Sequence, residues 1–196
     1  MNLLDTAFVR LVADLRALKV EWALVGGMAV SYRSRPRTTE DLDVAIAVVG
    51  DREAESIARG FRSRGYHHLP ESVLEHRDAK RLATVRFAAT AQDCAGVVVD
   101  LLFSSSGIEP ELVASAEVLE ILPRVSVPVA LTGHLLAMKI LAGREQDVRD
   151  AQWLWEAADE TEKQRARDAL ILITHRRYNR GKDLFSEMAR ILGSQP

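Results

Sequence analysis

Short apolar runs recur along the first two thirds of the chain, and each is bounded by polar or turn-forming residues. Runs of four to eight residues with few internal charges are typical of buried strands. We expect strands at residues 22–25, 42–49, 83–88 and 97–103.

Between these runs the apolar residues take helical spacing, with charged residues on the opposite face. We expect helices at residues 1–20, 28–33 and 52–64. Asp51 is the expected N-cap of the last helix, and Gly65 its end. The first part of the chain therefore predicts an alternating α/β fold.

Beyond residue 127 the strand signals disappear and apolar residues keep helical spacing to the end of the chain. The expected helices cover residues 128–142, 146–158, 160–174 and 182–192. We therefore expect an α/β (α+β) core with a mixed sheet and flanking helices in residues 1–127. A C-terminal helical bundle, residues 128–196, would cap this core, and a ligand would bind in the cleft between the two parts.

The composition predicts a compact protein without a strong overall field. Of 196 residues, 47% are hydrophobic, which is enough for a sizeable core, and 26 basic residues balance 28 acidic ones to a formal net charge of -2. Contact with a polyanion would have to be local. The single cysteine, Cys94, excludes an internal disulfide framework, and we expect it to be buried. Charges interrupt the N-terminal segment, so we expect a cytoplasmic protein with no membrane partner.

Candidate chemistry begins where the first expected strand ends. Gly26 and Gly27 follow the apolar residues 22–25 directly and precede a short helix. Such a turn can aim free N–H groups and the positive end of a helix at a phosphate. A tight turn with no ligand is the alternative, since glycine is the usual residue in strained turns.

Asp41 and Asp43 then flank one apolar residue at the start of the second expected strand. Alternate residues of a strand project to the same face, so the two carboxylates would lie together. Paired carboxylate oxygens suit Mg²⁺ or Mn²⁺. An N-cap aspartate with a solvent-facing neighbour is the alternative.

A third carboxylate is expected, because two-metal phosphoryl transfer usually needs one more ligand near the attacking oxygen. Asp100 is the best candidate, since it interrupts the apolar residues 97–103, where a lone buried charge would be costly. The alternative for Asp100 is a structural ion pair, for which Arg86 is the expected partner. Asp93 is the fallback ligand, although a turn explains it equally well.

These motifs together resemble the nucleotidyltransferase superfamily to which DNA polymerase β belongs, and most closely its AbiEii-type bacterial toxin branch. The resemblance rests on Gly26-Gly27, Arg37-Thr38 and Asp41-x-Asp43, with Asp100 on a later strand. It implies a nucleotidyltransferase-like fold in which the aspartates hold divalent metal and the glycine turn holds a nucleoside triphosphate (NTP). The polymerase-like branches often carry Ser after the first glycine. Here Gly27 and Met28 follow, so that position offers no hydroxyl, and Ser31 is a candidate substitute.

A second stretch, residues 131–154, is similar to the helices that follow the sheet in AbiEii-type proteins. Lys139 matches a helix-borne lysine that would reach the triphosphate, with a snorkelling surface lysine as the alternative. Asp147 or Asp150 could act as a general base, or could cap a helix and pair with Arg149. For Asp147 we favour the structural role.

Nearby basic residues and histidines add weaker signals. Arg37 is favoured as a phosphate ligand because it lies closest to the paired aspartates, while Arg33 and Arg35 stay open. His67 and His68 have no partners at metal-binding spacing, so they are read as surface or acceptor-site residues. The basic residues 176–182 could touch RNA or close the cap, and a solvated turn is favoured.

The leading hypothesis is transfer of a nucleoside monophosphate (NMP) from an NTP to an acceptor hydroxyl, with Mg²⁺ or Mn²⁺ as cofactor. By resemblance, the setting would be a type IV toxin-antitoxin system, with RNA such as tRNA as acceptor and a cognate antitoxin as partner. A small-molecule acceptor of the antibiotic type is the first alternative. An acidic groove formed by Glu71, Glu75 and Asp78 would support it. A non-catalytic nucleotide- or partner-binding module is the second.

Overall fold

The computed structural model describes residues 2–69 and 84–193. Within these residues the strands form one mixed sheet in the order β3-β4-β5-β2-β1-β7-β6. Two neighbouring pairs, β2 with β5 and β1 with β7, are parallel, and the other pairs are antiparallel. The strands are β1 (Trp22–Val25), β2 (Asp41–Ile46), β3 (Tyr66–His68), β4 (Thr84–Ala89), β5 (Val98–Leu102), β6 (Glu117–Leu122) and β7 (Val125–Val129).

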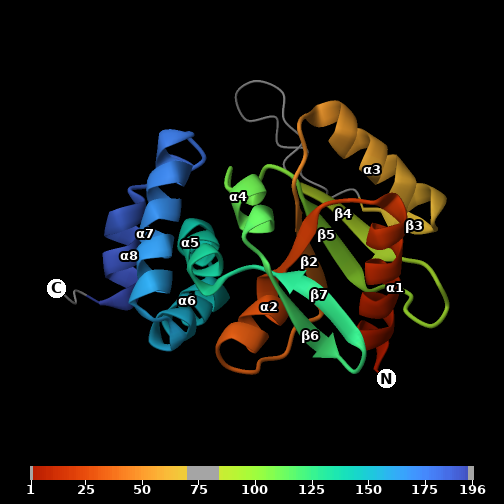
Figure 1. The fold of residues 1–196 in the computed structure, drawn as a ribbon, viewed down its shortest axis with the longest axis horizontal. Coiled ribbons are helices and arrows are strands. Elements are labelled where there is room, and N and C mark those ends of the chain that lie inside the picture. The colour runs from red at the N-terminus through yellow and green to blue at the C-terminus, as the bar shows by residue number, and fades with distance from the viewer. Residues whose placement is uncertain (1, 70–83, 194–196) are drawn as a thin grey trace.

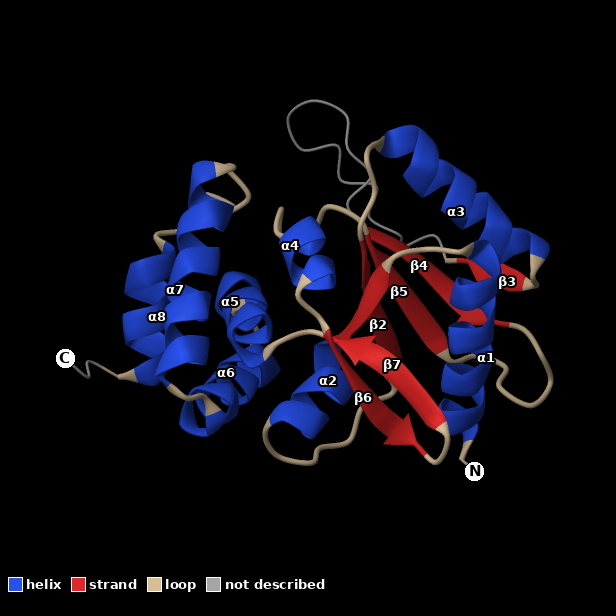
Figure 2. Ribbon diagram, in the orientation of Figure 1, coloured by secondary structure: helices blue, strands red, loops and turns tan. Residues whose placement is uncertain are grey.

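Helices cover both faces of this sheet (Figures 1 and 2). On one face lie α1 (Leu3–Leu18) and α3 (Asp51–Ser63), and on the other lie α2 (Gly26–Arg33) and α4 (Glu109–Ala114). The apolar face of α1, with Phe8, Leu11 and Leu15, is fully buried. Burying this stripe against the sheet explains why the periodic N-terminal segment forms a helix.

A bundle of four helices follows the last strand and packs beside α2 (Figure 1). These helices are α5 (Thr132–Ala142), α6 (Glu145–Ala157), α7 (Glu160–His175) and α8 (Leu184–Leu192). The sequence-based prediction of a mixed α/β core with a C-terminal helical part is confirmed for the fold class. The proposed division after residue 127 remains a prediction, and that position lies inside β7.

Several elements differ from the sequence-based expectation. The helix expected from residue 128 begins at Thr132, because Pro128 belongs to β7 and pairs with Val118 of β6. The β6–β7 hairpin was not predicted at all, although its strands flank a turn at Pro123 and Arg124. Neither were β3 and α4. The N-cap of α3 is Gly50 and not Asp51, which is the first helical residue.

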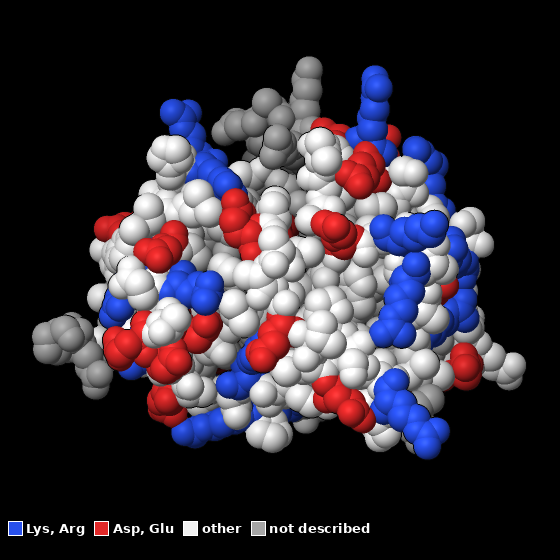
Figure 3. All heavy atoms as spheres, in the orientation of Figure 1, with Lys and Arg blue, Asp and Glu red and all other residues white. Residues whose placement is uncertain are grey.

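The buried residues form one continuous core that extends from the sheet into the bundle. Cys94 is buried, as expected. Among the described residues no helix combines the length and apolar character needed to cross a membrane. On the face shown in Figure 3, acidic and basic side chains are mixed over the helical bundle, and basic side chains predominate on the right, over α1.

Candidate active site

The glycine turn lies where β1 ends and α2 begins. Gly26 has a φ of +66°, a conformation that residues with a side chain rarely adopt. A Cβ atom on Gly26 would lie 1.8 Å from Oδ2 of Asp43. Both the backbone angle and this close approach therefore require glycine. Val25, which precedes the helix, has no side-chain oxygen to cap α2, so the first N–H groups of the helix depend on other acceptors.

Gly27 is required for a different reason. A Cβ atom at Gly27 would lie 2.5 Å from Nη2 of Arg37 and 2.7 Å from Oγ1 of Thr39. The segment between α2 and β2 therefore folds back over the glycine turn. Arg37 and Thr39 lie against the backbone that would face a phosphate.

Three aspartates gather on one face of the sheet. Asp41 and Asp43 are alternate residues of β2 and project to the same side. Asp43 pairs in register with Asp100 on the parallel neighbour β5, so these two side chains also share that side. We call Asp41, Asp43 and Asp100 the acidic cluster.

The surroundings of the acidic cluster disfavour the ionised forms of Asp41 and Asp43. Burial, followed by the nearby charge of Asp100, raises the pKa of Asp43 to about 6, against the opposing field of Lys139. Burial and Asp100 likewise raise the pKa of Asp41, which Arg86 opposes. Bringing a cation to these carboxylates would relieve both effects.

Arg86 of β4 holds the third carboxylate. Its Nε donates to Oδ1 of Asp100 at 2.8 Å and its Nη2 donates to Oδ2 at 2.7 Å. The ion pair expected as the alternative role of Asp100 is therefore present. Asp93, the fallback ligand, lies exposed in a turn before β5. It does not belong to the acidic cluster.

The acidic cluster fits a divalent cation in its chemistry, although it is not a preformed metal cage. Among the described residues no group of at least three His, Cys, Asp and Glu side chains is arranged to hold a metal ion. Asp41 and Asp43 provide oxygen ligands with raised pKa values, which suit a hard cation. Asp100 lies beside them and keeps free lone pairs on its oxygens despite the bond to Arg86.

Lys139 lies inside the protein, with only 8% of its surface exposed. The alternative of a snorkelling surface lysine is therefore wrong, because α5 is packed between the other helices of the bundle. Its Nζ lies 2.9 Å from Oδ1 of Asp147 and 2.9 Å from Oδ2 of Asp150. The ammonium group is thus held by two buried carboxylates of α6.

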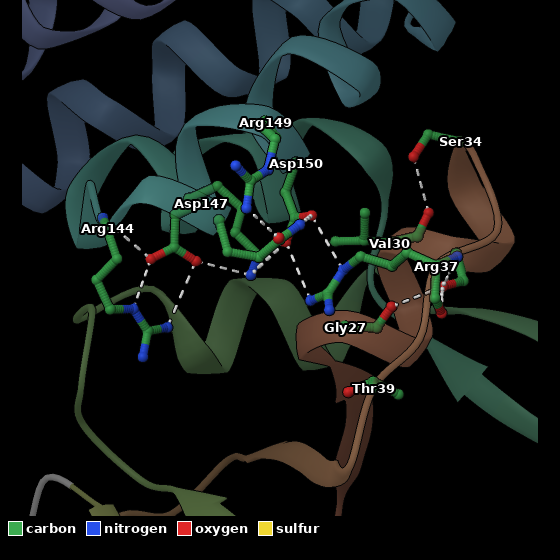
Figure 4. Close-up of polar contacts among 12 residues, drawn as sticks. Gly27, Val30, Ser34, Arg37, Thr39, Arg144, Asp147, Arg149 and Asp150 are labelled. Atoms are coloured by element: carbon green, nitrogen blue, oxygen red, sulfur yellow. Dashed lines mark hydrogen bonds and ion pairs between the residues drawn. The ribbon is translucent and has the colours of Figure 1, made fainter.

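Asp150 joins this lysine to the glycine turn. Arg37 approaches it with Nε 3.0 Å from Oδ1 and Nη2 3.1 Å from Oδ2 (Figure 4). Gln146 donates a further hydrogen bond at 2.9 Å. Asp150 is fully buried and its oxygens are engaged by three side chains. It is therefore poorly placed to accept a proton from a substrate.

Asp147 is the third residue of α6 and has the structural surroundings that the sequence favoured. It accepts hydrogen bonds from the backbone N–H of Arg144 at 3.2 Å and from Nε of Arg144 at 2.6 Å. Burial opposes its ionisation, but Arg144 and Lys139 outweigh that effect and lower the pKa of Asp147. The suggested pairing with Arg149 is wrong, because Arg149 pairs with Glu145 one turn away.

Together these residues form a chain of contacts from the glycine turn to the start of α6 (Figure 4). We call the chain Arg37–Asp150–Lys139–Asp147–Arg144 the buried network. At its outer end the Arg144 side chain is 78% exposed. Its charge also acts on Asp41 and Asp43.

The remaining nucleotide-site candidates are only partly brought together. Oγ of Ser31 donates to the carbonyl of Gly27 at 3.0 Å and accepts from the N–H of Arg37 at 3.2 Å, so it braces the turn. Thr38 is exposed. Its neighbour Thr39 is the threonine whose hydroxyl lies beside Gly27.

The other arginines of this segment make contacts within the protein. Arg33 pairs with Glu117 at 2.7 Å and donates to the carbonyl of Ala130. Arg35 pairs with Glu156 of α6 at 2.5 Å. The Arg33 contacts attach α2 to the β6–β7 hairpin, and the Arg35 contact attaches the loop after α2 to the bundle.

The late basic run and the histidines also lie apart from the acidic cluster. Arg176 pairs with Glu111, and Lys182 donates to the carbonyl of Leu141 at 2.9 Å, so part of the run closes the bundle. His67 and His68 belong to the edge strand β3. Glu71, Glu75 and Asp78 lie outside the described residues.

A separate hollow in the described part of the chain lies between α4, α5 and α7. It measures about 640 Å³, and the acidic cluster does not line it. Burial, helped by Arg165, lowers the pKa of His134 in its wall to about 4. Its three acidic residues are engaged within the protein: Glu111 pairs with Arg176, Glu160 pairs with Lys163, and Asp168 accepts a hydrogen bond from Gln164 at 2.9 Å. The hollow therefore gives no support to an acidic acceptor groove.

Sequence reasoning missed the contributions of Thr39 and Arg144 to the site. Thr39 had a signal, since it is two residues from Asp41 and so next to the start of β2. Arg144 precedes Asp147 by three residues, the spacing of a helix cap. Tertiary packing brings Thr39 beside Gly27 and brings the charge of Arg144 close enough to act on Asp41 and Asp43.

Comparisons with known proteins bear on the fold and the family of the chain. No curated protein matches the chain. Among solved structures it is similar to an antigenic nucleotidyltransferase-like protein from Paracoccidioides brasiliensis, with a TM-score of 0.52 and 20% identity over 93% of this chain and 90% of that one. At this identity the similarity shows the fold.

A second similar structure is the lincomycin-bound lincosamide antibiotic adenylyltransferase LnuA, with a TM-score of 0.45 and 10% identity over 77% of this chain and 96% of that one. A sequence model of a family described as nucleotidyl transferase AbiEii toxin of type IV toxin-antitoxin systems matches residues 10–194. With a match over nearly its whole length, the chain belongs to the AbiEii nucleotidyl transferase toxin family.

Proposed function

We propose that the protein transfers an NMP from an NTP to an acceptor hydroxyl with the help of a divalent cation. The observation that carries the proposal is the alignment of Asp41, Asp43 and Asp100 on one face of the sheet, beside the glycine turn that opens α2. Carboxylates for a cation and N–H groups for phosphates then lie within one site.

Asp41 and Asp43 would hold the cation, Mg²⁺ or Mn²⁺, with Asp100 as the third ligand. A bound divalent cation supplies charge compensation for the triphosphate and makes the acceptor hydroxyl more acidic. The raised pKa values of Asp41 and Asp43 support this assignment, because burial and the neighbouring carboxylate of Asp100 disfavour their ionised forms, and a bound cation would stabilise those forms.

The glycine turn would bind the phosphates through its backbone N–H groups. Gly26 and Gly27 have no side chains, so phosphates could approach the backbone closely. Ser31 of α2 stabilises the glycine turn through its hydrogen bond to the carbonyl of Gly27. Thr38 stays a candidate for contact from the exposed side of the loop. Thr39 is the stronger candidate, because its hydroxyl lies beside Gly27.

Arg37 and Lys139 would stabilise the negative charge that develops on the triphosphate. Both are held by Asp150, which fixes their positions before a nucleotide arrives. In the reaction the acceptor oxygen bonds to the α-phosphorus while the bond from that phosphorus to the bridging oxygen breaks. Pyrophosphate leaves, and the hydroxyl proton is released.

Family membership supports a toxin of a bacterial type IV toxin-antitoxin system, with a cognate antitoxin as partner. RNA, including the end of a tRNA, is the acceptor that we propose first. The described residues form no acidic groove that would support a small-molecule acceptor. The register of Asp100 with Asp43 favours turnover over a binding module, since all three carboxylates are aligned.

The first test is isothermal titration of each NTP into the protein with Mg²⁺, and again with EDTA. Binding that needs Mg²⁺ and disappears in the double variant Asp41→Ala, Asp43→Ala is expected. A matched control is Glu145→Ala with Glu156→Ala, which also removes two carboxylates but from the exposed surface of α6. If no NTP binds, or if the control loses binding equally, the proposal fails.

Transfer itself is tested with NTP labelled at the α-phosphate and total bacterial RNA. We expect label on RNA only with Mg²⁺ or Mn²⁺ and only with intact Asp41 and Asp43. If the protein binds NTP but no RNA is labelled, the proposal that RNA is the acceptor is wrong. Label on a small hydroxyl compound would identify that compound as the acceptor.

A further inference from the structure

The acidic cluster contains a resident positive charge. Arg86 engages both oxygens of Asp100 through one edge of its guanidinium group, at 2.8 and 2.7 Å. Such a two-point contact fixes the plane of the carboxylate as well as its position. Asp100 is 6% exposed, so it has little freedom to turn elsewhere.

The sheet register places this charge in line with the cluster. Arg86 on β4 pairs directly with Asp100 on β5, and Asp100 pairs directly with Asp43 on β2. Directly opposed residues share a face of the sheet, so Arg86, Asp100 and Asp43 form a row across three strands. The guanidinium therefore lies on the same side as the expected cation.

The charges of the acidic cluster and of Arg86 can be added. The three carboxylates carry three negative charges, and Arg86 neutralises one of them at the most buried end. Its field reaches the neighbouring Asp41, where it opposes the rise in pKa. A guanidinium stays charged at all relevant pH values, so this compensation is permanent.

We infer that Arg86 is a positioning residue that serves as a built-in counter-cation for Asp100 and keeps the divalent-cation affinity of the nucleotide-free site low. This inference rests on the proposed function of the acidic cluster as a cation site. Strong cation binding then depends on the additional negative charge that a triphosphate brings. The site is thereby set to bind the cation and the nucleotide together.

The inference makes a prediction opposite to that of a purely structural ion pair. Breaking a structural pair would leave cation binding unchanged or weaken it, because Asp100 would lose its orientation. Removing a counter-cation should strengthen binding, because a unit charge a few ångströms away repels a divalent ion. The expected gain is on the order of tenfold in water-like surroundings.

The test is a Mn²⁺ titration of the nucleotide-free protein, followed by electron paramagnetic resonance of free Mn²⁺. Arg86→Gln is expected to bind Mn²⁺ about tenfold more tightly than the wild type, by the same Coulomb estimate. Arg86→Lys keeps the charge, so its affinity should stay close to that of the wild type. Thermal melting verifies that each variant is folded, and Arg86→Met is the second uncharged variant if Arg86→Gln is unstable.

A matched control is Arg176→Gln. Arg176 also makes a two-point pair, with Glu111, and its side chain is 36% exposed like that of Arg86, but it lies on the helical bundle. Its loss should leave Mn²⁺ affinity unchanged. Equal or weaker binding by Arg86→Gln, or tighter binding by Arg86→Lys, would overturn the inference alone. Failure of the wild type to bind Mn²⁺ would overturn the cation site with it.

Discussion

Asp150 is the residue whose replacement tests the buried network most directly. It is fully buried on α6, and the charged groups of Lys139 and Arg37 lie 2.9 and 3.0 Å from its oxygens. Asp150→Asn keeps the shape of the side chain but removes its charge. It also puts an NH₂ group, a donor, where a carboxylate oxygen accepted. Two buried cations then lack their common partner.

The size of the effect follows from that loss. Breaking a buried ion pair by removing one partner costs about 3–5 kcal/mol, because an uncompensated charge stays inside the protein. For a chain of this length each kcal/mol lowers the melting temperature by about 2–4 °C. We therefore expect a fall in melting temperature of roughly 6–20 °C.

The assay is urea denaturation with a parallel thermal melt. Glu145→Gln is the control. The Glu145 side chain lies on the same helix, is 88% exposed and pairs with Arg149. An exposed pair of this kind is worth about 0.3–0.5 kcal/mol. A loss below about 1 kcal/mol in Asp150→Asn would refute the reasoning, because it would mean that Lys139 and Arg37 are not held by this charge.

The same variant should also weaken NTP binding, since Asp150 holds Arg37 against Gly27 and holds Lys139 where its charge acts on Asp43. The comparison is made at a temperature where both proteins are folded. Full NTP affinity in a folded but destabilised Asp150→Asn would separate the network from the site and leave it a purely structural feature.

Two further predictions concern the glycine turn and the acidic cluster. Gly26→Ala should lower the free energy of unfolding by about 1–2 kcal/mol, because alanine is strained in the left-handed backbone conformation of this position. It should also abolish Mg²⁺-dependent NTP binding, because the new Cβ displaces Asp43. NTP binding that persists in titration calorimetry would contradict this. Because the pKa of Asp43 is raised to about 6 in the folded protein, the unfolded chain releases the Asp43 proton at a lower pH than the folded chain does. The free energy of unfolding in EDTA should therefore fall as the pH rises from about 4 to about 6. Asp43→Asn should remove that fall and stabilise the cation-free protein at pH 7 in urea denaturation; an unchanged pH slope would show that Asp43 is not the titrating group.

Local sequence pattern was sufficient for most elements but not for the hairpin before the bundle. The strands β1, β2, β4 and β5 and the helices of the bundle have strong apolar periodicity, and the structure contains each within a few residues of its expected position. The β6–β7 hairpin lies at the sheet edge and has more exposed positions, so its apolar runs are weaker. Edge strands bury one face at most, which weakens the signal that a run of residues can give.

The same division holds for the site. That Asp41 and Asp43 share a face follows from the two-residue period of any strand, and the need for Gly26 follows from a turn between a strand and a helix. Sequence named Asp100 and Arg86 as partners but left two roles open for Asp100. The cross-strand register shows both neighbours at once, with Asp43 on one side and Arg86 on the other.

The sequence by itself determined the elements and the acidic residues that they carry, because these depend on periodicities within a few residues. Only the tertiary structure decided the surroundings of Lys139. The sequence left a contact with the triphosphate and a position on the surface open, and the bundle buries Lys139 between Asp147 and Asp150. Burial and charge pairing depend on contacts between segments far apart in the chain. Local pattern cannot specify these contacts, because the packing of whole helices and strands sets them.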